Sequence, residues 1–158
     1  MKLLGVLELA RPSLRRTLLA GGAASTAYLV EQAIDRRITR NNYDDLVLLG
    51  GMVSQQPLRQ KLLGALAHYT FGTVLAAAYD AAQPSLPRLP AWLRGLAFAQ
   101  AENTILFPAV AMLDTIHPAV RRGALPPLWT WRYFRIEVAR HAAYGIVLGL
   151  VSADREAG

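Results

Sequence analysis

The chain has no cysteine, which excludes disulfide bonds and thiolate metal sites. It is also poor in charge, because Asp, Glu, Lys and Arg make up only 18% of its 158 residues, against about 25% in an average soluble domain. Apolar residues reach 53%, and the mean hydropathy is +0.24. This composition favours a membrane protein, in a chain of the length of one ordinary domain.

The sequence also lacks the motifs of common enzymes and of nucleic-acid-binding proteins. It contains no nucleophile elbow, no glycine-rich phosphate loop and no His-Glu-x-x-His zinc motif. We therefore expect a non-enzymatic protein with no catalytic residues. The 17 Lys and Arg residues exceed the 11 Asp and Glu residues, but they collect at the ends of apolar segments, as membrane anchors do. No zinc-finger, homeodomain or RNA-binding signature is present, so nucleic acid is not an expected partner.

Four apolar segments are present, at about residues 17–34, 62–79, 95–113 and 131–153. Each is close to the roughly 20 residues that cross a hydrocarbon layer of about 30 Å as a helix. The alternative is a soluble four-helix bundle, but segment 62–79 has no charged side chain before Asp80, and a surface helix would show a polar face. The sequence predicts a single all-α membrane domain, residues 1–158, with four transmembrane helices in the lipid bilayer. They would form two tandem hairpins, at about 14–82 and 93–153.

The connecting segments carry further signals. Residues 41–56 hold an apolar run that is too short to cross a bilayer and ends in Gly50-Gly51, which predicts an interfacial or re-entrant helix. Three prolines between 84 and 90 predict a tight turn between the hairpins. Residues 3–10 are expected to form a short interfacial helix rather than a removable signal peptide. The count of Lys and Arg places the connectors 36–60 and 115–130 in the cytoplasm.

A nine-residue pattern occurs twice, at 68–76 and 141–149: His, an aromatic residue at +3, Gly at +4, Val at +6, Leu at +7 and a small residue at +8. It predicts an internal repeat. Small residues spaced by four lie on one helical face and let helix backbones approach closely. We expect such packing faces in the second and fourth segments to join the hairpins, and to favour a homo-oligomer or other membrane subunits as partners. The residues of these faces are Gly64, Gly72, Ala76, Gly145 and Gly149.

Glu102, next to Asn103, is the residue of the third segment whose placement inside a membrane costs the most free energy. A carboxylate at the centre of a membrane helix costs about 2.5–3.5 kcal/mol, so Glu102 should face the bundle interior and pair with His68, His141 or Arg140. It would belong either to a proton or substrate path, or to a buried polar pair that fixes helix register.

Two other polar or irregular features are expected to be structural. Glu31 and Asp35, one turn apart at the end of the first segment, are expected at the interface and solvated. Phe107-Pro108 is expected to bend the third helix, because proline removes a backbone donor.

The two histidines, His68 and His141, are expected at similar depth in parallel helices. Two neutral imidazoles at one level could ligate a haem iron from both sides, so haem b is an alternative to the expectation of no cofactor. No third ligand is evident for another metal. The other interpretation of each imidazole is a hydrogen-bonded structural group.

The order His68-x-x-Phe71, Val74, Tyr79, a proline turn, Leu93-x-Gly95-Leu96 and Phe107-Pro108 resembles the YagU-type group of small bacterial inner-membrane proteins. The resemblance covers about residues 65–115. It implies a polytopic protein of the bacterial inner membrane with helical hairpins, and it supplies no catalytic residues.

These observations predict a small scaffold or a subunit of a membrane assembly. The alternative from the same residues is a small transporter, or a redox carrier with haem b, that uses Glu102, His68 and His141.

Overall fold

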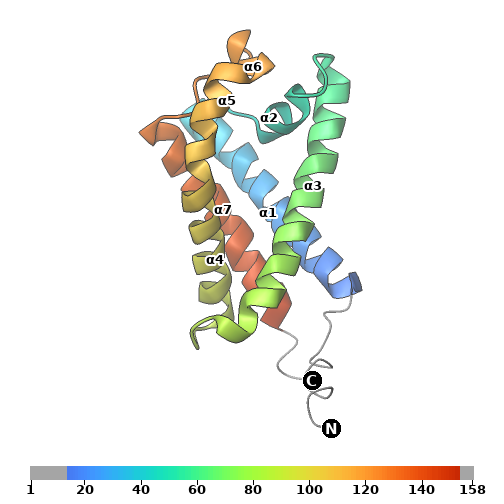
Figure 1. Ribbon diagram of the computed structural model, residues 1–158, viewed down its shortest axis with the longest axis vertical. Helices are drawn as coiled ribbons and strands as arrows, with labels where there is room; N and C mark the ends of the chain where they lie inside the picture. The colour runs from blue at the N-terminus through green and yellow to red at the C-terminus, as the bar shows by residue number, and fades with distance from the viewer. Residues whose placement is uncertain (1–13, 154–158) are drawn as a thin grey trace.

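The computed structural model describes residues 14–153, and within them it contains helices and no strand, as the sequence predicts (Figure 1). Four long segments, α1, α3, α4 and α7, form the bundle, and three short helices complete it. The elements in chain order are α1 (Leu14–Thr39), α2 (Asp45–Gly51), α3 (Pro57–Ala82), the 3₁₀ turn η1 (Gln83–Ser85), α4 (Ala91–Leu106), the 3₁₀ turn η2 (Phe107–Ala109), α5 (Val110–Ile116), α6 (Pro118–Arg121) and α7 (Trp131–Ala153).

The long helices pack in the order α3, α1, α7, α4, so that α1 and α7 form the centre of the bundle. Helices α3 and α4 lie on opposite sides, and α2, α5 and α6 gather at one end (Figure 1). Helix α1 therefore contacts α3 within the first hairpin, α4 contacts α7 within the second, and the hairpins meet along α1 and α7.

The glycines of the small-residue faces pack chiefly against helices of their own hairpin, which corrects the expectation that the two faces join α3 to α7 directly. The contact across the hairpins at these faces is that of Tyr144 of α7 with Gly72 of α3. On α3, an added Cβ at Gly64 would meet the backbone of Leu46 in α2, and one at Gly72 would meet Ser25 in α1. On α7, an added Cβ at Gly145 would lie 2.5 Å from the Gly95 carbonyl oxygen of α4. Ala76 of α3 is 0% exposed, and Gly149 of α7 packs against the backbone at the start of α4. The hairpins instead meet through α1, because its own small residues let α3 and α7 approach it from two sides.

The predicted breaks in the helices are confirmed. Helix α4 ends at Leu106, and the chain turns by 50° through η2 into α5, because Pro108 cannot donate a helical hydrogen bond. The prolines after α3 give the η1 turn and an extended link to α4. The apolar run after residue 44 forms α2, a helix of 7 residues. The interfacial helix expected at 3–10 lies outside the described residues.

Among the described residues, two helices are long and apolar enough to cross a membrane: α3 extended to Ser85, and α7. The bent pair α4 and α5 raises the number to three if it forms one span. The first of the four expected segments, residues 17–34 in α1, does not reach this standard, because charged and polar residues occupy both ends of the helix and lower its hydropathy. The most apolar window of α3 is only 28% buried, and the helix carries exposed apolar side chains such as Leu58, Leu62 and Leu66 on its outer surface.

The core has two parts. Around the crossing of the long helices it contains small and aromatic residues: Ala20, Ala24, Tyr28, Ala76, Tyr79, Ala99, Tyr144 and Leu148. At the end covered by α2 and α6, a second cluster contains Tyr43, Leu48, Ala119, Leu125, Leu128, Tyr133 and Ile136. Alanine and glycine at the first crossing allow close backbone packing, which is the principal source of helix association in lipid.

We predict that Gly145→Ala destabilises the protein. The new methyl group would meet the Gly95 carbonyl oxygen at 2.5 Å and the Ala99 Cβ at 2.8 Å, and such overpacking costs about 1–3 kcal/mol. The matched control is Gly22→Ala in α1, where an added Cβ meets nothing within 4 Å, so that its stability should stay equal or rise slightly through helix propensity. The free energy of unfolding, measured by SDS titration in mixed micelles, tests the difference; equal values for the two variants would contradict this packing.

Candidate functional site

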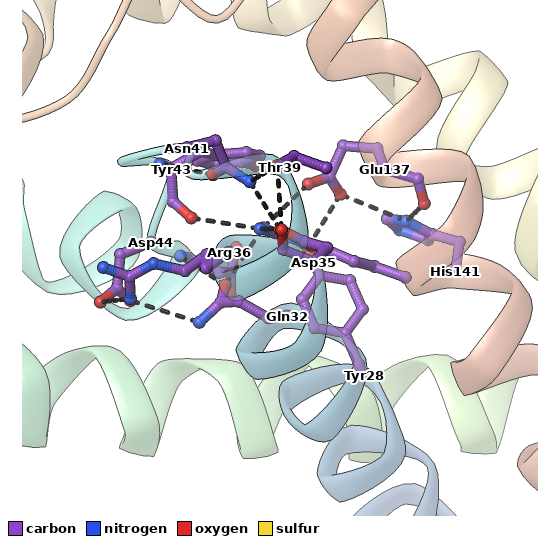
Figure 2. A network of polar contacts seen from close by, with 12 residues as sticks. Tyr28, Gln32, Asp35, Arg36, Thr39, Asn41, Tyr43, Asp44, Glu137 and His141 are labelled. Carbon is purple, nitrogen blue, oxygen red and sulfur yellow. Dashed lines mark hydrogen bonds and ion pairs between the residues drawn. The ribbon is translucent and has the colours of Figure 1, made fainter.

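Figure 2 shows a network of polar contacts inside the bundle, with Asp35, Glu137 and His141 among its labelled members. The residue with the most hydrogen bonds in this network is Arg140 of α7, which is fully buried. Its Nε donates to Asp35 Oδ2 at 2.6 Å and its Nη2 to Asp35 Oδ1 at 3.1 Å, a bidentate pair between α7 and α1. Its Nη1 donates to Gln32 Oε1 at 3.1 Å. Asp35 is therefore 7% exposed rather than solvated at the interface as expected, because it compensates the buried guanidinium.

The same arginine fixes the connector between α1 and α2. Arg140 Nη2 donates to the Tyr43 carbonyl oxygen at 3.1 Å, and the guanidinium lies 4.5 Å from the centre of the Tyr43 ring. Asn41 Nδ2 donates to Asp35 Oδ1 at 2.7 Å, and Arg36 forms an ion pair with Asp44 at 2.6 Å. Burial, together with the carboxylates of Glu137 and Asp45, raises the pKa of Tyr43 well above its ordinary value. Tyr43 therefore remains an uncharged phenol beside the arginine.

A chain of polar contacts leads from this network to Glu102. The Tyr28 hydroxyl donates a hydrogen bond to Glu137 Oε2 at 2.8 Å, and His141 Nδ1 lies 3.3 Å from the same carboxylate oxygen. The other ring nitrogen of His141, Nε2, lies 3.1 Å from Glu102 Oε2. Of the three partners that the sequence offered for Glu102, the structure places His141 beside it, while Arg140 pairs with Asp35.

The second histidine is held by the start of α2. His68 Nδ1 lies 2.7 Å from Asp45 Oδ2, and His68 Nε2 lies 3.1 Å from the carbonyl oxygen of Ser25. A carbonyl oxygen can only accept, so Nε2 carries a proton and donates it. Asp45 was not predicted as a site residue; the only signal for it was the Asp44-Asp45 pair before the apolar run, which a solvated connector explains equally well.

The two imidazoles do not fit bis-histidine ligation of a haem. The Tyr28 ring contacts both of them, with its centre 4.9 Å from that of His68 and 5.4 Å from that of His141. Every ring nitrogen faces an oxygen atom, including His141 Nδ1, which lies 2.9 Å from the Glu137 carbonyl oxygen. No nitrogen lone pair is directed at a common point where an iron atom could bind. Within residues 14–153, no three His, Asp or Glu side chains are grouped to hold a metal ion.

A groove of about 400 Å³ adjoins these histidines between α3 and the α4–α5 pair. Its sides are apolar, and its charged lining residues are Asp45, His68, Glu102, Glu137 and His141. Three lining side chains have a buried polar atom that makes no hydrogen bond: Ser25 Oγ, Asn103 Nδ2 and Glu102 Oε2. Ser25 is 0% exposed and Asn103 is 3% exposed, while Glu102 Oε2 has an ion pair with His141. The apolar lining comes from Phe71, Val74 and Leu75 of α3, Leu48 and Leu49 of α2, and Leu106, Phe107, Val110 and Leu113 around the α4–α5 bend.

This groove brings together all four predicted site residues, Glu102, Asn103, His68 and His141, from three helices. Tyr144 at its edge donates to the Gly72 carbonyl oxygen at 2.6 Å, which joins α7 to α3. By size, the groove is in the range of small-molecule pockets, which are mostly apolar with a few placed polar groups. It is suited to an organic molecule with one polar end.

We predict that Arg140→Gln is strongly destabilising. It leaves the buried Asp35 and Glu137 carboxylates without their cation, and breaking one partner of a buried ion pair costs about 3–5 kcal/mol. The control is Arg135→Gln, at an exposed position one turn earlier on α7, with an expected change below about 0.5 kcal/mol. SDS unfolding measures both variants. The double variant Asp35→Asn with Arg140→Gln should recover part of the loss, and no recovery would contradict the pairing.

The chain was compared with family models, with curated protein sequences and with solved structures, and none of the three comparisons finds a match. The resemblance to YagU-type proteins stays a prediction, and the function has to be argued from the groove and its side chains.

Proposed function

We propose that this chain is an integral membrane protein that binds an amphipathic small molecule in the groove between α3 and α4–α5, as a small transporter or carrier would. The observation that supports it is the lining of the groove, which combines apolar residues such as Phe71 and Phe107 with titratable groups such as Glu102 and His141. A purely structural polar pair does not need an adjoining space of about 400 Å³.

The unpartnered atoms in the groove support a ligand. A buried polar group without a partner costs about 1–3 kcal/mol, and such groups are few in native proteins. Asn103 Nδ2 and Ser25 Oγ both lie on the groove wall without partners. Both atoms are closed to solvent in the structure, so a polar ligand group or water would satisfy them after a small rotation of the side chains, whereas an empty or purely apolar groove would not.

In this proposal four segments cross the membrane: α1, α3, the bent pair α4–α5, and α7. Helix α1 has 26 residues, and at 1.5 Å per residue it is about 39 Å long, enough to span. It is the central helix, and its Asp35 is neutralised by Arg140, so it needs less apolar surface than α3. The positive-inside rule supports an orientation with connectors 36–60 and 115–130 in the cytoplasm, and the resemblance supports the bacterial inner membrane.

The scaffold or subunit role favoured by the sequence has less support than ligand binding. It depended on small residues available to partner helices, and Gly64, Gly72 and Gly145 are instead covered by α1, α2 and α4 of the same chain. Contacts with other copies would have to use the exposed apolar side of α3. A scaffold also gives no role to the groove.

The test uses a photoreactive alcohol, a ten-carbon chain with an aryl diazirine at its end, added to the protein in phosphatidylcholine vesicles. We expect residue-level labelling of the groove side of α3 and α4, near Val74 and Leu106, in excess over the outer face at Leu62. Val74→Trp should reduce groove labelling at least threefold, because the indole would occupy the space, whereas Ala77→Trp, exposed on the same helix outside the groove, should not. Labelling confined to the outer face would overturn the proposal.

A further inference from the structure

The charged groups that line the groove are three carboxylates and two imidazoles, and no described Lys or Arg lines it. Arg140, which does not line the groove, contacts Glu137 at 3.5 Å, but its bidentate ion pair is with Asp35. Even with both imidazoles positively charged, His68 beside Asp45 and His141 beside Glu137 and Glu102, the carboxylates exceed the imidazoles by one. An apolar setting makes such an excess costly, since few solvent dipoles are present to stabilise it.

The geometry locates this excess at Glu102. Among the lining carboxylates, Asp45 is 2.7 Å from His68 Nδ1, and Glu137 accepts from Tyr28 at 2.8 Å. Glu102 Oε2 lies 3.1 Å from His141 Nε2, but it shares this imidazole with Glu137. Glu137 is also contacted by Arg140 at 3.5 Å. The Glu102 side chain is 18% exposed, against 10% for Asp45 and 8% for Glu137, so it is the most accessible of the three carboxylates. The groove lining thus offers one incompletely compensated carboxylate to a molecule that enters.

We propose that the groove takes a cationic amphiphile: a molecule with a protonated amine and an apolar body, its ammonium directed to Glu102. The body would lie along Phe71 and Val74 on one side and along Leu106 and Phe107 on the other. This inference rests on the proposed function, and it adds the class of ligand. An anionic head group would face three carboxylates without an arginine, and a neutral one would leave the excess charge uncompensated.

The experiment compares three photoreactive probes of equal chain length with an ammonium, a hydroxyl or a carboxylate head. For each, groove labelling near Leu106 is divided by outer-face labelling at Leu62, which corrects for the amount of probe in the bilayer. We expect the ammonium ratio to exceed the hydroxyl ratio about tenfold, as a charge-assisted hydrogen bond would give, and the carboxylate ratio to be the lowest.

The outcome separates this inference from the proposed function. Groove labelling by all three probes without preference, or with preference for the carboxylate, overturns the cationic ligand and leaves the groove as a binding site. Absence of groove labelling by any probe overturns both. The comparison of the three probes uses only the wild-type protein, so its result does not depend on whether a variant folds.

A charge-removing variant then tests the residue. In Glu102→Gln the ammonium-to-hydroxyl preference should fall toward one. The matched control is Glu31→Gln, a carboxylate on α1 that lies outside the groove, and it should keep the preference. A preference that survives Glu102→Gln would show that another carboxylate, Asp45 or Glu137, receives the amine, and would overturn the role of Glu102.

Discussion

The ion pair between Arg140 and Asp35 is the interaction on which the rest of the structure depends. It joins residues 105 positions apart in the sequence and connects the central helix of each hairpin, α1 and α7. A guanidinium that is 0% exposed is stable only when its donors are occupied, and Asp35, Gln32 and the Tyr43 carbonyl oxygen occupy them. The two hairpins are therefore held at one rotation and one height by a polar contact as well as by packing.

The position of the groove follows from that contact. Arg140 holds the connector after α1, and Gln32 accepts a hydrogen bond from the Asp45 backbone at 2.8 Å, so α2 begins where the Asp45 carboxylate meets His68. Tyr28, which lies between both histidines, donates to Glu137 on the α7 turn that also holds Arg140. The histidines are thus hydrogen-bonded groups that both contact Tyr28, and the groove lies beside them between α3 and the bent α4–α5 pair.

Much of the fold could be predicted from the sequence. Helix positions follow from apolar segments, the bend at Pro108 from a missing donor, and the short α2 from a run that ends in Gly50-Gly51. The buried location of Glu102 and its pairing with a histidine follow from the cost of a carboxylate among apolar residues. The predictions that failed concern partners: the glycine faces of α3 and α7 are covered by different helices, and Asp35 is buried rather than solvated.

The sequence by itself determined the helices, their breaks, their apolar surfaces and the presence of a few costly polar residues, because these depend on side chains within a few turns of one another. Only the tertiary structure decided that α1 lies with α7 at the centre of the bundle. It also decided that Arg140 pairs with Asp35 while Glu102 lies beside His141, and that Asp45 lines the groove. These choices depend on the relative rotation and height of helices far apart in the chain. A one-residue shift turns a helical side chain by about 100°, so neither composition nor spacing could select the partners.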